Sequence, residues 1–584
     1  MASSFNHVTY QQLPSSPSSS SQPGMSSITK KDPELEEILD DQLTSTSLEQ
    51  EPVKATLFVY VLVFCVCVGG FLFGYDTGGT SLLMPLLHRK KKPLLTLDHS
   101  LVTHLVISGA LQPIQDEFGL DTVKKELVVG ATTFGAIFGG FFAGMYSDKF
   151  GRKLLILFAS AVFIVGALLL ALAPNFACLL VGRLVVGLGV GVASMIVPVF
   201  VSEIAPKNIR GRLTTLNTLV ITFGQVIAYV INIAFSNVDQ GWRYMFGLAG
   251  IPALFQLVVM PFLPESPRHL VISGRKDDAR MVIRKIYGDS VSDAFINNEI
   301  DLISDDINNS RAGHFKDFKL AEHYKPLIIA CILQAAQQLS GFNAAMYYAA
   351  TILQMAGFRS NQNSTSVAII VAATNLVFTM VAVLVIDRVG RRKMLVVTML
   401  TMIAGLIALG ATFGVQQGFI PKQDSCAGYA THCARCVIDP DCGWSASQDT
   451  CIVTKGHDPN DIFASPTGCP PRSNDHAITG ILITALIVYV ASYALGLGYA
   501  PWLIQSEIFT TAMRGKANGI STAVNWICNL IVSTTFLSMT DSITTGGTYF
   551  FYAGVSLVLY ILIYFLVPET SNRTLEEVHK AFIK

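Results

Sequence analysis

The first hydrophobic segment carries the side chain with the most distinctive chemistry. The stretch Gly69–Gly78 reads GGFLFGYDTG and places a carboxylate, Asp76, at the end of a run of bilayer-compatible residues. A charged side chain at membrane depth is costly, so it usually faces the interior of a helix bundle and usually has a function. We predict that Asp76 carries a proton. The alternative is a helix that simply ends in solvent at Asp76.

The composition predicts that this carboxylate belongs to a membrane protein. The 584 residues are 51% hydrophobic and 14% charged, which is too little charge to cover a soluble protein of this size. The apolar residues come in blocks of about 20, the length that crosses roughly 30 Å of hydrocarbon. The formal net charge is zero, so no basic surface favours nucleic acid. We expect the lipid bilayer as a partner, and no enzyme activity, cofactor or metal.

The apolar blocks predict an all-α membrane protein with twelve transmembrane helices in two sets of six. Lys and Arg crowd every second loop, so both termini and the long central segment are expected in the cytosol. The N-terminal region is Ser-rich and acidic without an apolar core, so we expect no cleaved signal peptide. The predicted parts are a disordered cytosolic tail (1–53), an N-terminal bundle (54–265), a cytosolic helical linker (266–323), a C-terminal bundle (324–567) and a cytosolic tail (568–584).

The two halves repeat one another, which predicts a two-domain transporter with its site between the repeats. The segment Asp148–Lys153 (DKFGRK) corresponds to Asp387–Arg392 (DRVGRR). Opposite charges at these helix ends are expected to form ion-pair networks that hold the cytosolic face shut and break as the halves move. Charges that merely fix the topology are the alternative for each residue singly, but not for a spacing that occurs twice. The predicted cytosolic gate comprises Asp148, Arg152, Glu203, Arg210, Asp387, Arg391, Glu507 and Arg514.

The second half contains a hydrophilic insertion, about 416–475, that we expect outside the cell. An even number of cysteines in such a segment predicts disulfides, whose pairing the sequence leaves open. Zinc binding by Cys433-x-x-Cys436 is the rival interpretation, which an oxidising compartment disfavours. Asn363, in the external loop after the seventh helix, begins a sequon and is expected to carry a glycan. The predicted disulfide cysteines are Cys426, Cys433, Cys436, Cys442, Cys451 and Cys469.

Seven motifs follow one another along the chain: GGFLFGYDTG, GRLVVGLGVGVASMIVPVFVSEIAPKNIRGR, PESPR, QQLSGFNAAMYY, DRVGRR, PWLIQSEIF and PETSNRTLEE. Together they resemble the motifs of the sugar-porter family of the major facilitator superfamily. The resemblance covers about 54–78 and 106–570, less the loop at 416–475. It implies two six-helix bundles, a cytosolic helical linker and alternating access to a central site for a small polyol.

The resemblance also implies which residues bind the substrate. Sugar recognition needs amide and hydroxyl hydrogen bonds, and an unpaired amide at membrane depth is costly. Each amide taken alone is equally consistent with a bridge between two helices. Tyr347 and Tyr348 resemble the aromatic residues of the family's extracellular gate, and they fit interfacial tyrosines nearly as well. The implied substrate contacts are Gln225, Gln337, Gln338, Asn343, Asn375, Trp502 and Asn525.

Proton coupling is a further implication of the resemblance. Family members that couple transport to protons tend to have an acid at the position of Asp76, and an arginine matching Arg183 can pair with it. Deprotonated Asp76 would be held by Arg183, and protonation would release the arginine.

The cysteine-rich loop narrows the expected substrate. Such a loop between helices nine and ten marks the proton/myo-inositol cotransporters among the sugar porters, so we expect proton-coupled symport of myo-inositol across the plasma membrane. The alternatives are a facilitative hexose transporter, and a sensor or adhesion protein that binds an extracellular partner through the loop.

Residues 79–105 depart from the family pattern by interrupting the first helix. They contain His88–Lys92 (HRKKK), whose consecutive cations cannot lie at mid-membrane depth. Without them, GYDTG joins VISGALQPI in a run that is similar to the family's continuous first helix. A translated intron or alternative exon and an extruded loop are the two interpretations of this atypical insertion. A second departure is Leu495–Pro501, which has fewer prolines than is usual where the tenth helix flexes.

Overall fold

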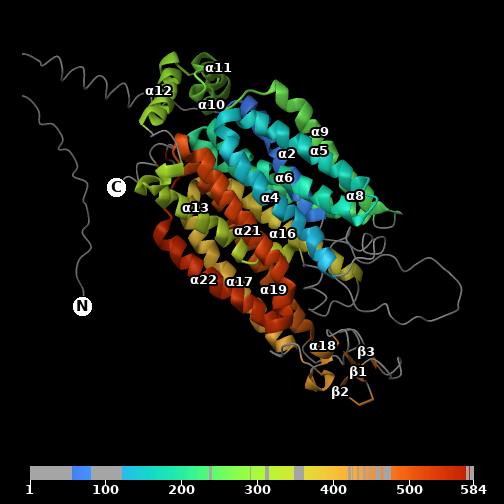
Figure 1. Cartoon of the computed structure of the whole chain (residues 1–584). Coiled ribbons are helices and arrows are strands. Elements are labelled where there is room, and N and C mark those ends of the chain that lie inside the picture. Colours follow the sequence, from blue (N-terminus) through green and yellow to red (C-terminus); the bar gives the residue numbers. More distant parts are fainter. Residues whose placement is uncertain are drawn as a thin grey trace, which may run out of the picture. The chain divides into compact units, whose positions relative to one another are not determined.

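The computed structural model consists mainly of long helices (Figure 1). It describes residues 55–79, 122–235, 238, 240–289, 291–309, 315–347, 361–417, 475–571, 573 and 578, together with parts of 423–463. The predicted N-terminal tail and the atypical insertion beyond Gly79 lie outside the described residues.

The first half contains five long helices followed by a sixth that is divided in two. Helix α6 illustrates how local sequence sets their bounds. The side chain of Asn175 accepts a hydrogen bond from the backbone N–H of Cys178 (2.9 Å), and the chain turns extended at Ala205, just before Pro206. The helices are α2 (Leu57–Gly79), α4 (Thr122–Phe150), α5 (Arg152–Ala171), α6 (Phe176–Ile204), α7 (Arg210–Phe235), α8 (Gly241–Leu248) and α9 (Gly250–Val259).

Three short helices connect the halves. Helix α11 is amphipathic, because its buried apolar residues recur at helical spacing while charged residues lie between them. The hydroxyl of Thr56, just before α2, donates to the carbonyl oxygen of Lys285 at 2.7 Å and so ties this linker to the first helix. The linker helices are α10 (Pro267–Ile272), α11 (Lys276–Tyr287) and α12 (Asp293–Asn309), and 3₁₀ turns lie at η1 (Lys207–Ile209), η2 (Met260–Phe262) and η3 (Phe315–Lys319).

The second half repeats the six-helix plan, with two of its helices divided. Eleven segments of the described residues are long and apolar enough to cross a membrane, and α21 supplies the twelfth transmembrane helix. The helices are α13 (Ala321–Leu339), α14 (Phe342–Tyr347), α16 (Asn361–Val389), α17 (Arg391–Gln417), α19 (Asp475–Leu495), α20 (Ala500–Glu507), α21 (Thr511–Ile543) and α22 (Thr545–Leu566).

Helix α21 is less apolar than the other spanning helices because protein surrounds much of it. It packs against α4 of the first half and against α13 of its own half. Its polar side chains therefore meet protein groups rather than lipid, which is where polar residues are tolerated in a membrane. Its buried polar residues include Asn518, Ser521, Thr522, Asn525 and Asn529.

The contact between α4 and α21 depends on small residues from both halves. A Cβ atom added to Gly144 would collide with the Cα of Gly519 and lie 2.6 Å from the carbonyl oxygen of Gly515. One turn away, a Cβ on Gly140 would lie 2.6 Å from a methyl carbon of Thr522. Backbones of the two halves thus touch directly, as small residues allow in membrane proteins.

Two helices of the second half are interrupted at glycines. Gly341 separates α13 from α14 with φ +80°, a conformation that side chains rarely adopt. Beyond α19, the backbone N–H groups of Gly496 and Gly498 both donate to the carbonyl oxygen of Tyr493, at 3.1 and 2.8 Å. The tenth transmembrane segment is therefore broken by glycines even though it has few prolines.

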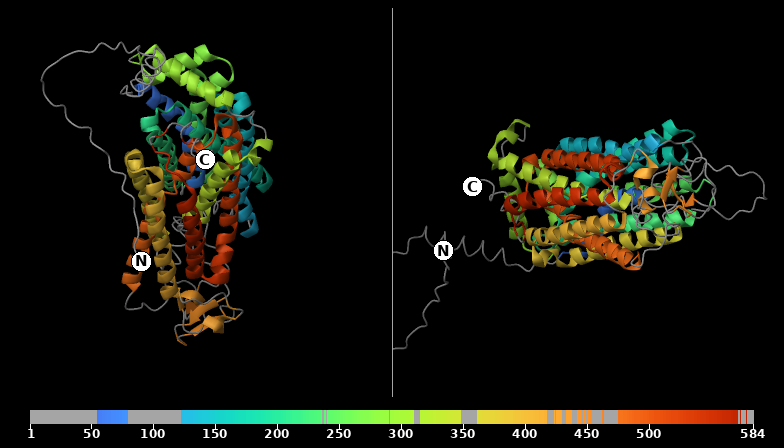
Figure 2. Two further views of the ribbon diagram at one scale, coloured as in Figure 1. Left: turned by 90° about the vertical axis from the view of Figure 1, so that its left-hand side faces the viewer. Right: turned by 90° about the horizontal axis from the view of Figure 1, so that it is seen from below.

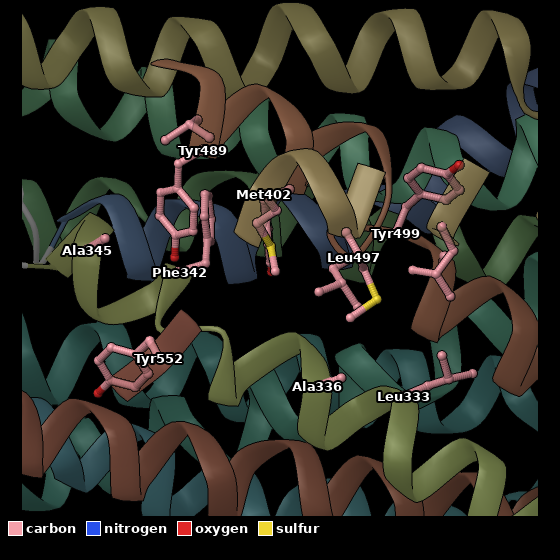
Figure 3. Packing of buried hydrophobic residues seen from close by; sticks show 14 of the residues in the cluster. Leu333, Ala336, Phe342, Ala345, Met402, Tyr489, Leu497, Tyr499 and Tyr552 are labelled. Atoms are coloured by element: carbon pink, nitrogen blue, oxygen red, sulfur yellow. The ribbon is translucent and has the colours of Figure 1, made fainter. Parts of the chain in front are cut away.

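The hydrophobic core of the second half packs around the first of these breaks. The ring of Phe342 stacks on Tyr493 with centroids 3.5 Å apart, and Tyr489 lies 6.2 Å away. Figure 3 shows Phe342 beside Tyr489. The hydroxyl of Tyr489 donates to the carbonyl oxygen of Ser340 at 3.0 Å, which satisfies a group that the break leaves outside the helix. Aromatic packing thus holds the interrupted segment in place.

The cysteine-rich segment contains a small disulfide-bonded sheet. Strand β1 (Cys442–Ser445) pairs antiparallel with β2 (Thr450–Val453) and with β3 (Ile462–Phe463). Short turns at η4 (Cys426–Tyr429) and α18 (Cys433–Cys436) precede it. In Figure 2 this module lies at the opposite end of the long helices from α10–α12. We call these two ends the loop side and the linker side.

The disulfide prediction is confirmed for five of the six cysteines. Disulfides join Cys426 to Cys442 and Cys436 to Cys451, and Cys433 is disulfide-bonded as well. Cys469 lies outside the described residues. The zinc interpretation of Cys433-x-x-Cys436 is wrong, because both sulfur atoms are already in disulfides.

Helix α16 begins earlier than the sequence predicts. Asn363 is expected in a loop, yet the backbone is helical from Asn361, while the apolar span starts at Ile369. A helix needs apolar residues only within the hydrocarbon, so its first turns can be polar. The loop position is therefore wrong, and a glycan on Asn363 stays a prediction.

Candidate functional site

Asp76 and Arg183 form a buried ion pair between α2 and α6. The Arg183 Nη1 lies 2.6 Å from Asp76 Oδ1, and the Arg183 Nε donates to the carbonyl oxygen of Val128 at 3.3 Å. Asp76 is 8% exposed and Arg183 is 2% exposed. The alternative in which the helix ends in solvent at Asp76 is therefore wrong. A charge buried this deeply persists because its partner is adjacent.

Small cavities lie on two sides of Asp76. One is bounded mainly by apolar residues such as Phe163 and Met245. The other is bounded by Phe73, Thr132 and Trp526 together with the ion pair itself. Packing around Asp76 is therefore incomplete on both sides.

A cluster of amides joins α13 and α14 to α21. The Asn525 Nδ2 donates to Gln334 Oε1 at 2.6 Å and to Gln337 Oε1 at 2.8 Å. The Gln338 Nε2 donates to Asn525 Oδ1 at 3.0 Å, and the Asn343 Nδ2 donates to Gln338 Oε1 at 2.6 Å. The structure therefore brings four of the seven predicted substrate contacts, Gln337, Gln338, Asn343 and Asn525, into one hydrogen-bonded network.

The break in the tenth transmembrane segment adds acceptors to this network. The Gln337 Nε2 donates to the carbonyl oxygens of Leu497 and Gly498 at 2.9 and 3.0 Å. Trp502, on α20 just beyond the break, is buried. Within the described part of the chain it joins no amide by a hydrogen bond.

A second, smaller network joins the two halves. The Gln225 Nε2 donates to Thr77 Oγ1 at 3.1 Å, one residue after Asp76. The Asn375 Nδ2 of the second half donates to Gln225 Oε1 at 3.4 Å. These two amides thus connect α7 to α16 beside the helix that carries the ion pair.

Sequence reasoning missed three buried residues next to these networks. The Gln334 Nε2 donates to Gln505 Oε1 at 2.7 Å, which extends the amide cluster to α20. The Trp526 indole borders the cavity beside Asp76 and follows Asn525 in the chain. A signal was present for the two glutamines: Gln505 lies within PWLIQSEIF, and Gln334 lies three residues before QQLSGFNAAMYY. Trp526 lies in none of the quoted motifs, and its only signal is its place directly after Asn525.

The amides satisfy one another in this arrangement, which bears on what they can bind. A buried amide without a partner costs about 1–3 kcal/mol, so these side chains must exchange one partner for another rather than lose it. A polyol offers hydroxyl groups that both donate and accept. A small polyhydroxylated ring can therefore replace the bonds between the amides with bonds to itself.

The predicted gate residues of the first half meet on the linker side. The Arg152 Nη2 lies 2.8 Å from Glu203 Oε1, and its Nη1 lies 3.3 Å from Asp148 Oδ1. Ser266 donates to the other Glu203 oxygen at 2.5 Å. The backbone N–H groups that open α5 donate to Glu265, as expected for a carboxylate at a helix N-terminus.

The second half repeats this arrangement almost atom for atom. The Arg391 Nη2 lies 3.4 Å from Glu507 Oε1, and its Nη1 lies 3.3 Å from Asp387 Oδ1. Thr570 donates to Glu507 at 2.7 Å, and Glu569 accepts from the N–H groups that open α17. The preceding glycine of each loop has a positive φ, +86° at position 151 and +93° at position 390. The duplication of the sequence is thus a duplication of contacts.

Ion pairs of this region also cross between the halves. The Arg514 Nη1 of α21 lies 3.6 Å from Glu203 Oε1 of α6. The Arg212 Nε of α7 lies 3.5 Å from Asp387 Oδ2 of α16, and the Arg212 N–H donates to the same oxygen at 3.1 Å. Arg212 is not among the predicted gate residues, whereas Arg210 is and donates to the carbonyl oxygen of Arg573 at 3.5 Å. The halves are therefore held together on the linker side.

The linker helices add a further contact across the halves. The Asp306 Oδ2 of α12 accepts from the backbone N–H of Thr511, the first residue of α21, at 3.1 Å. The Arg268 Nη1 of α10 donates to the Thr511 hydroxyl at 3.0 Å and lies 4.0 Å from Asp306.

His269 lies against the gate of the first half. A Cβ atom placed on Gly151 would meet both the Glu265 carboxylate and the His269 Nε2, so the two side chains are neighbours. Burial lowers the pKa of His269, the nearby carboxylates of Glu265, Glu203 and Asp148 oppose that shift, and Arg152 adds to it.

Some predicted residues cannot be assigned contacts. Tyr347 ends α14, but its side chain lies outside the described residues, as do Tyr348 and the side chain of Asn363. Among the residues that the structure describes, no group of three or more His, Cys, Asp and Glu side chains could hold a metal ion.

The structure has twelve transmembrane helices in two similar halves, a buried ion pair within the first half, a buried amide cluster within the second, and an amide contact between them. These features define a membrane transport protein of the major facilitator fold. The family model described as "Sugar (and other) transporter" matches residues 62–437 and 462–582. The chain belongs to this family.

Similar proteins of known description include inositol transporters from distant organisms. A human "Proton myo-inositol cotransporter" is 36% identical over 563 residues, which cover 90% of this chain and 82% of that protein. "Myo-inositol transporter 1" of Cryptococcus neoformans is 37% identical over 540 residues, with 91% and 82% covered. "Probable inositol transporter 2" of Arabidopsis thaliana is 34% identical over 565 residues, with 90% and 91% covered.

Solved structures support the same fold. The proton:xylose symporter XylE bound to 6-bromo-6-deoxy-D-glucose superposes with a TM-score of 0.69 at 24% sequence identity, covering 90% of this chain and 99% of that one. The inward-open conformation of the E. coli xylose transporter XylE gives 0.58 at 25% identity, covering 90% and 99%.

Proposed function

We propose that this chain is a symporter that moves myo-inositol together with protons by alternating access. The observation that carries the proposal is the buried Asp76–Arg183 pair, which lies one residue from Thr77 and its hydrogen bond to Gln225. A titratable group is thus placed beside polar groups that suit a polyol. The descriptions of the similar human and fungal proteins as myo-inositol transporters support the choice of substrate.

The ion pair suggests how a proton acts. With Asp76 deprotonated, the 2.6 Å contact with Arg183 stabilises both charges in a surrounding that otherwise disfavours them. Protonation removes one charge and weakens the hold on Arg183, so α2 and α6 are free to shift relative to one another. A proton and a substrate that both favour the same conformation are coupled by that preference alone.

The amides and the gate supply the remaining parts of the proposed transport mechanism, which are substrate binding and closure of the linker side. The amide cluster of the second half and the Gln225–Asn375 contact bind the polyol between the halves. The crossing pairs Arg514–Glu203 and Arg212–Asp387 close the linker side. Arg212 is partly exposed, and a partly solvated ion pair contributes modestly, which suits a contact that breaks in every transport cycle. The Arg514–Glu203 pair is buried and depends on its charges staying together.

We place the chain in the plasma membrane with both termini and the linker side in the cytosol. The positive-inside bias of the loops supports this orientation. The disulfides of the module fit an oxidising compartment on the loop side. A partner that binds this module outside the cell stays a prediction, tested by binding of the purified full-length protein to cells with and without disulfide reduction.

The proposal is tested by uptake of labelled myo-inositol and labelled glucose into cells that express the chain, at acidic and at neutral external pH. We expect accumulation of myo-inositol that acid stimulates. Glucose preference without acid stimulation would identify a facilitative hexose carrier instead. Absence of flux for both compounds, with the protein present at the surface, would favour the sensor or adhesion alternative.

The variant Asp76→Asn tests the proton site directly. It keeps the shape of the side chain and removes its charge, so we expect acid-stimulated accumulation to be lost while exchange of labelled for unlabelled myo-inositol continues. Accumulation that survives in this variant would exclude Asp76 as the proton site.

A further inference from the structure

Trp526 contacts both helices of the first half that carry the ion pair. It comes from α21 of the second half and is 1% exposed. Its Nε1 donates to the Ser194 hydroxyl of α6 at 3.1 Å. Its ring meets Phe73 of α2 edge-on, with centroids 5.2 Å apart and planes 66° apart.

The Phe73 contact lies close to the proton site, and the Ser194 contact lies farther along the helix that carries Arg183. Phe73 and Asp76 are one turn apart on α2, and Arg183 and Ser194 are about three turns apart on one face of α6. Phe73, Asp76, Arg183 and Trp526 border one small cavity, together with Thr132 and Thr133 of α4. Two other ionisable side chains border these described cavities with Asp76, namely Arg183 and Tyr75. The Tyr75 hydroxyl donates to the carbonyl oxygen of Met245.

On its other side, Trp526 adjoins the amide cluster. The preceding residue, Asn525, holds Gln334, Gln337 and Gln338 through hydrogen bonds of 2.6 to 3.0 Å. Neighbouring residues of a helix point about 100° apart. One turn of α21 therefore presents the Asn525 amide to the amide cluster and the Trp526 indole to the cavity beside the ion pair. Because a helix is rigid over a single turn, a displacement of Trp526 displaces Asn525 as well.

We propose that the Ser194–Trp526 hydrogen bond is a coupling contact, through which the state of the Asp76–Arg183 pair is transmitted to the substrate amides at Asn525. This inference rests on the proposed function and adds a positioning pair to it. When Arg183 is released and α2 and α6 shift, Ser194 and Phe73 carry Trp526 with them, and Asn525 changes its place relative to α13. Substrate that binds Asn525 acts on the ion pair by the same route, because coupling between two sites is reciprocal.

The alternative is a contact that merely holds the halves together. Such a contact affects every mode of transport equally, because empty, loaded and protonated forms all depend on it. A coupling contact instead affects the dependence of accumulation on the proton gradient and spares exchange, which needs no net proton movement. The two roles therefore predict different ratios of accumulation to exchange.

The test compares Ser194→Ala, Trp526→Phe and the double variant in full-length protein, measuring acid-driven accumulation and exchange of labelled myo-inositol. Ser202→Ala is the matched control, since Ser202 is also buried on α6 and also donates to the carbonyl oxygen three residues before it, as Ser194 does. We expect the ratio of accumulation to exchange to fall about fivefold in Ser194→Ala, the effect of one buried hydrogen bond. The double variant should be no worse than Trp526→Phe alone.

Each outcome decides between the roles. An unchanged ratio in Ser194→Ala, or a proportional loss of accumulation and exchange, overturns the coupling role while leaving the proposed function intact. A fall of equal size in Ser202→Ala overturns it too. If the unmodified protein shows no acid-driven accumulation, the proposed function itself fails, and the coupling role fails with it.

Discussion

Buried amides in this protein serve two different purposes, and their partners distinguish them. Gln256 of α9 donates to the carbonyl oxygens of Cys65 and Val66 and accepts from Ser160, all within the first half. Among the described residues, Asn525 instead bonds to the side-chain amides of its neighbours and to one main-chain carbonyl, and the side-chain amides can turn toward a ligand. The first kind fastens helices, and the second kind can exchange its partners.

This difference predicts opposite effects of the same substitution. Asn525→Leu should raise the KM for myo-inositol by roughly 10- to 100-fold, because the loss of one or two buried hydrogen bonds amounts to about 1–3 kcal/mol. Gln256→Leu should leave KM near its original value and lower the thermal stability of the purified protein. Uptake kinetics and melting temperatures of both variants check this, and a changed KM in Gln256→Leu alone would reverse the assignment.

His269 predicts a pH dependence of stability that originates outside the membrane. Burial holds its pKa below the ordinary value of about 6.5, so below that pH the unfolded chain binds a proton that the folded protein resists. Stability from this residue is therefore complete above about pH 6.5 and falls as the pH drops toward the lowered pKa. Melting temperatures of the solubilised protein across this window should fall less steeply in His269→Gln. Parallel curves for the two proteins would show that His269 does not titrate there.

At the scale of elements, the division of helices by glycine shapes the site. Gly341 allows Asn343 to reach Gln338, and the turn at Gly496–Gly498 exposes the carbonyl oxygens that Gln337 uses. An unbroken helix would keep those carbonyl oxygens in its own ladder of hydrogen bonds. The breaks thus convert backbone groups into parts of the site.

Helix α4 offers two glycines that test how closely the halves must approach. A Cβ atom on Gly144 would meet backbone atoms of Gly519 and Gly515, which cannot yield, whereas one on Gly130 would lie 3.4 Å from a methyl carbon of Leu530. Gly144→Ala should therefore reduce the uptake rate roughly 10-fold, since overpacking costs about 1–3 kcal/mol. Gly130→Ala, the same change on the same interface, should remain close to the original rate. Uptake normalised to surface expression checks the pair, and equal rates in both variants would contradict the prediction.

Over the whole molecule, features that repeat along the chain could be predicted and contacts between distant helices could not. The number of helices follows from apolar length, and the pairing of Arg152 with Glu203 and of Arg391 with Glu507 follows a spacing that occurs twice. By contrast, Ser194 and Trp526 lie in different halves, and no periodicity relates them. The gate role of Arg212 is not predicted for the same reason, because its partner Asp387 belongs to the other half. The start of α16 at Asn361 was not predicted because apolar residues indicate only the part of a helix that lies within the membrane.

The linker helices provide a prediction about the conformation of the entire protein. The Asp306 carboxylate of α12 holds the first backbone N–H of α21 while Arg268 holds the Thr511 hydroxyl, so the linker fastens the second half on the linker side. A hydrogen bond to a charged group contributes about 1.5–3 kcal/mol, and its removal should shift the balance toward states open on that side roughly 10-fold. Asp306→Ala should therefore open the linker side more often.

Chemical labelling measures this opening. A cysteine introduced as Thr218→Cys replaces a residue that is 8% exposed on α7, a helix that packs against α16 of the second half. A thiol reagent applied from the linker side should therefore reach it faster when the halves separate there. Labelling should be faster when Asp306→Ala is added, and unchanged when Asp301→Ala, an exposed position on the same helix, is added instead. Reaction of the native cysteines is subtracted using the same proteins without Thr218→Cys. Equal rates with Asp306→Ala and Asp301→Ala would mean that the closed side depends on the crossing ion pairs at Glu203 and Asp387 and not on the linker, because those pairs remain intact in both variants.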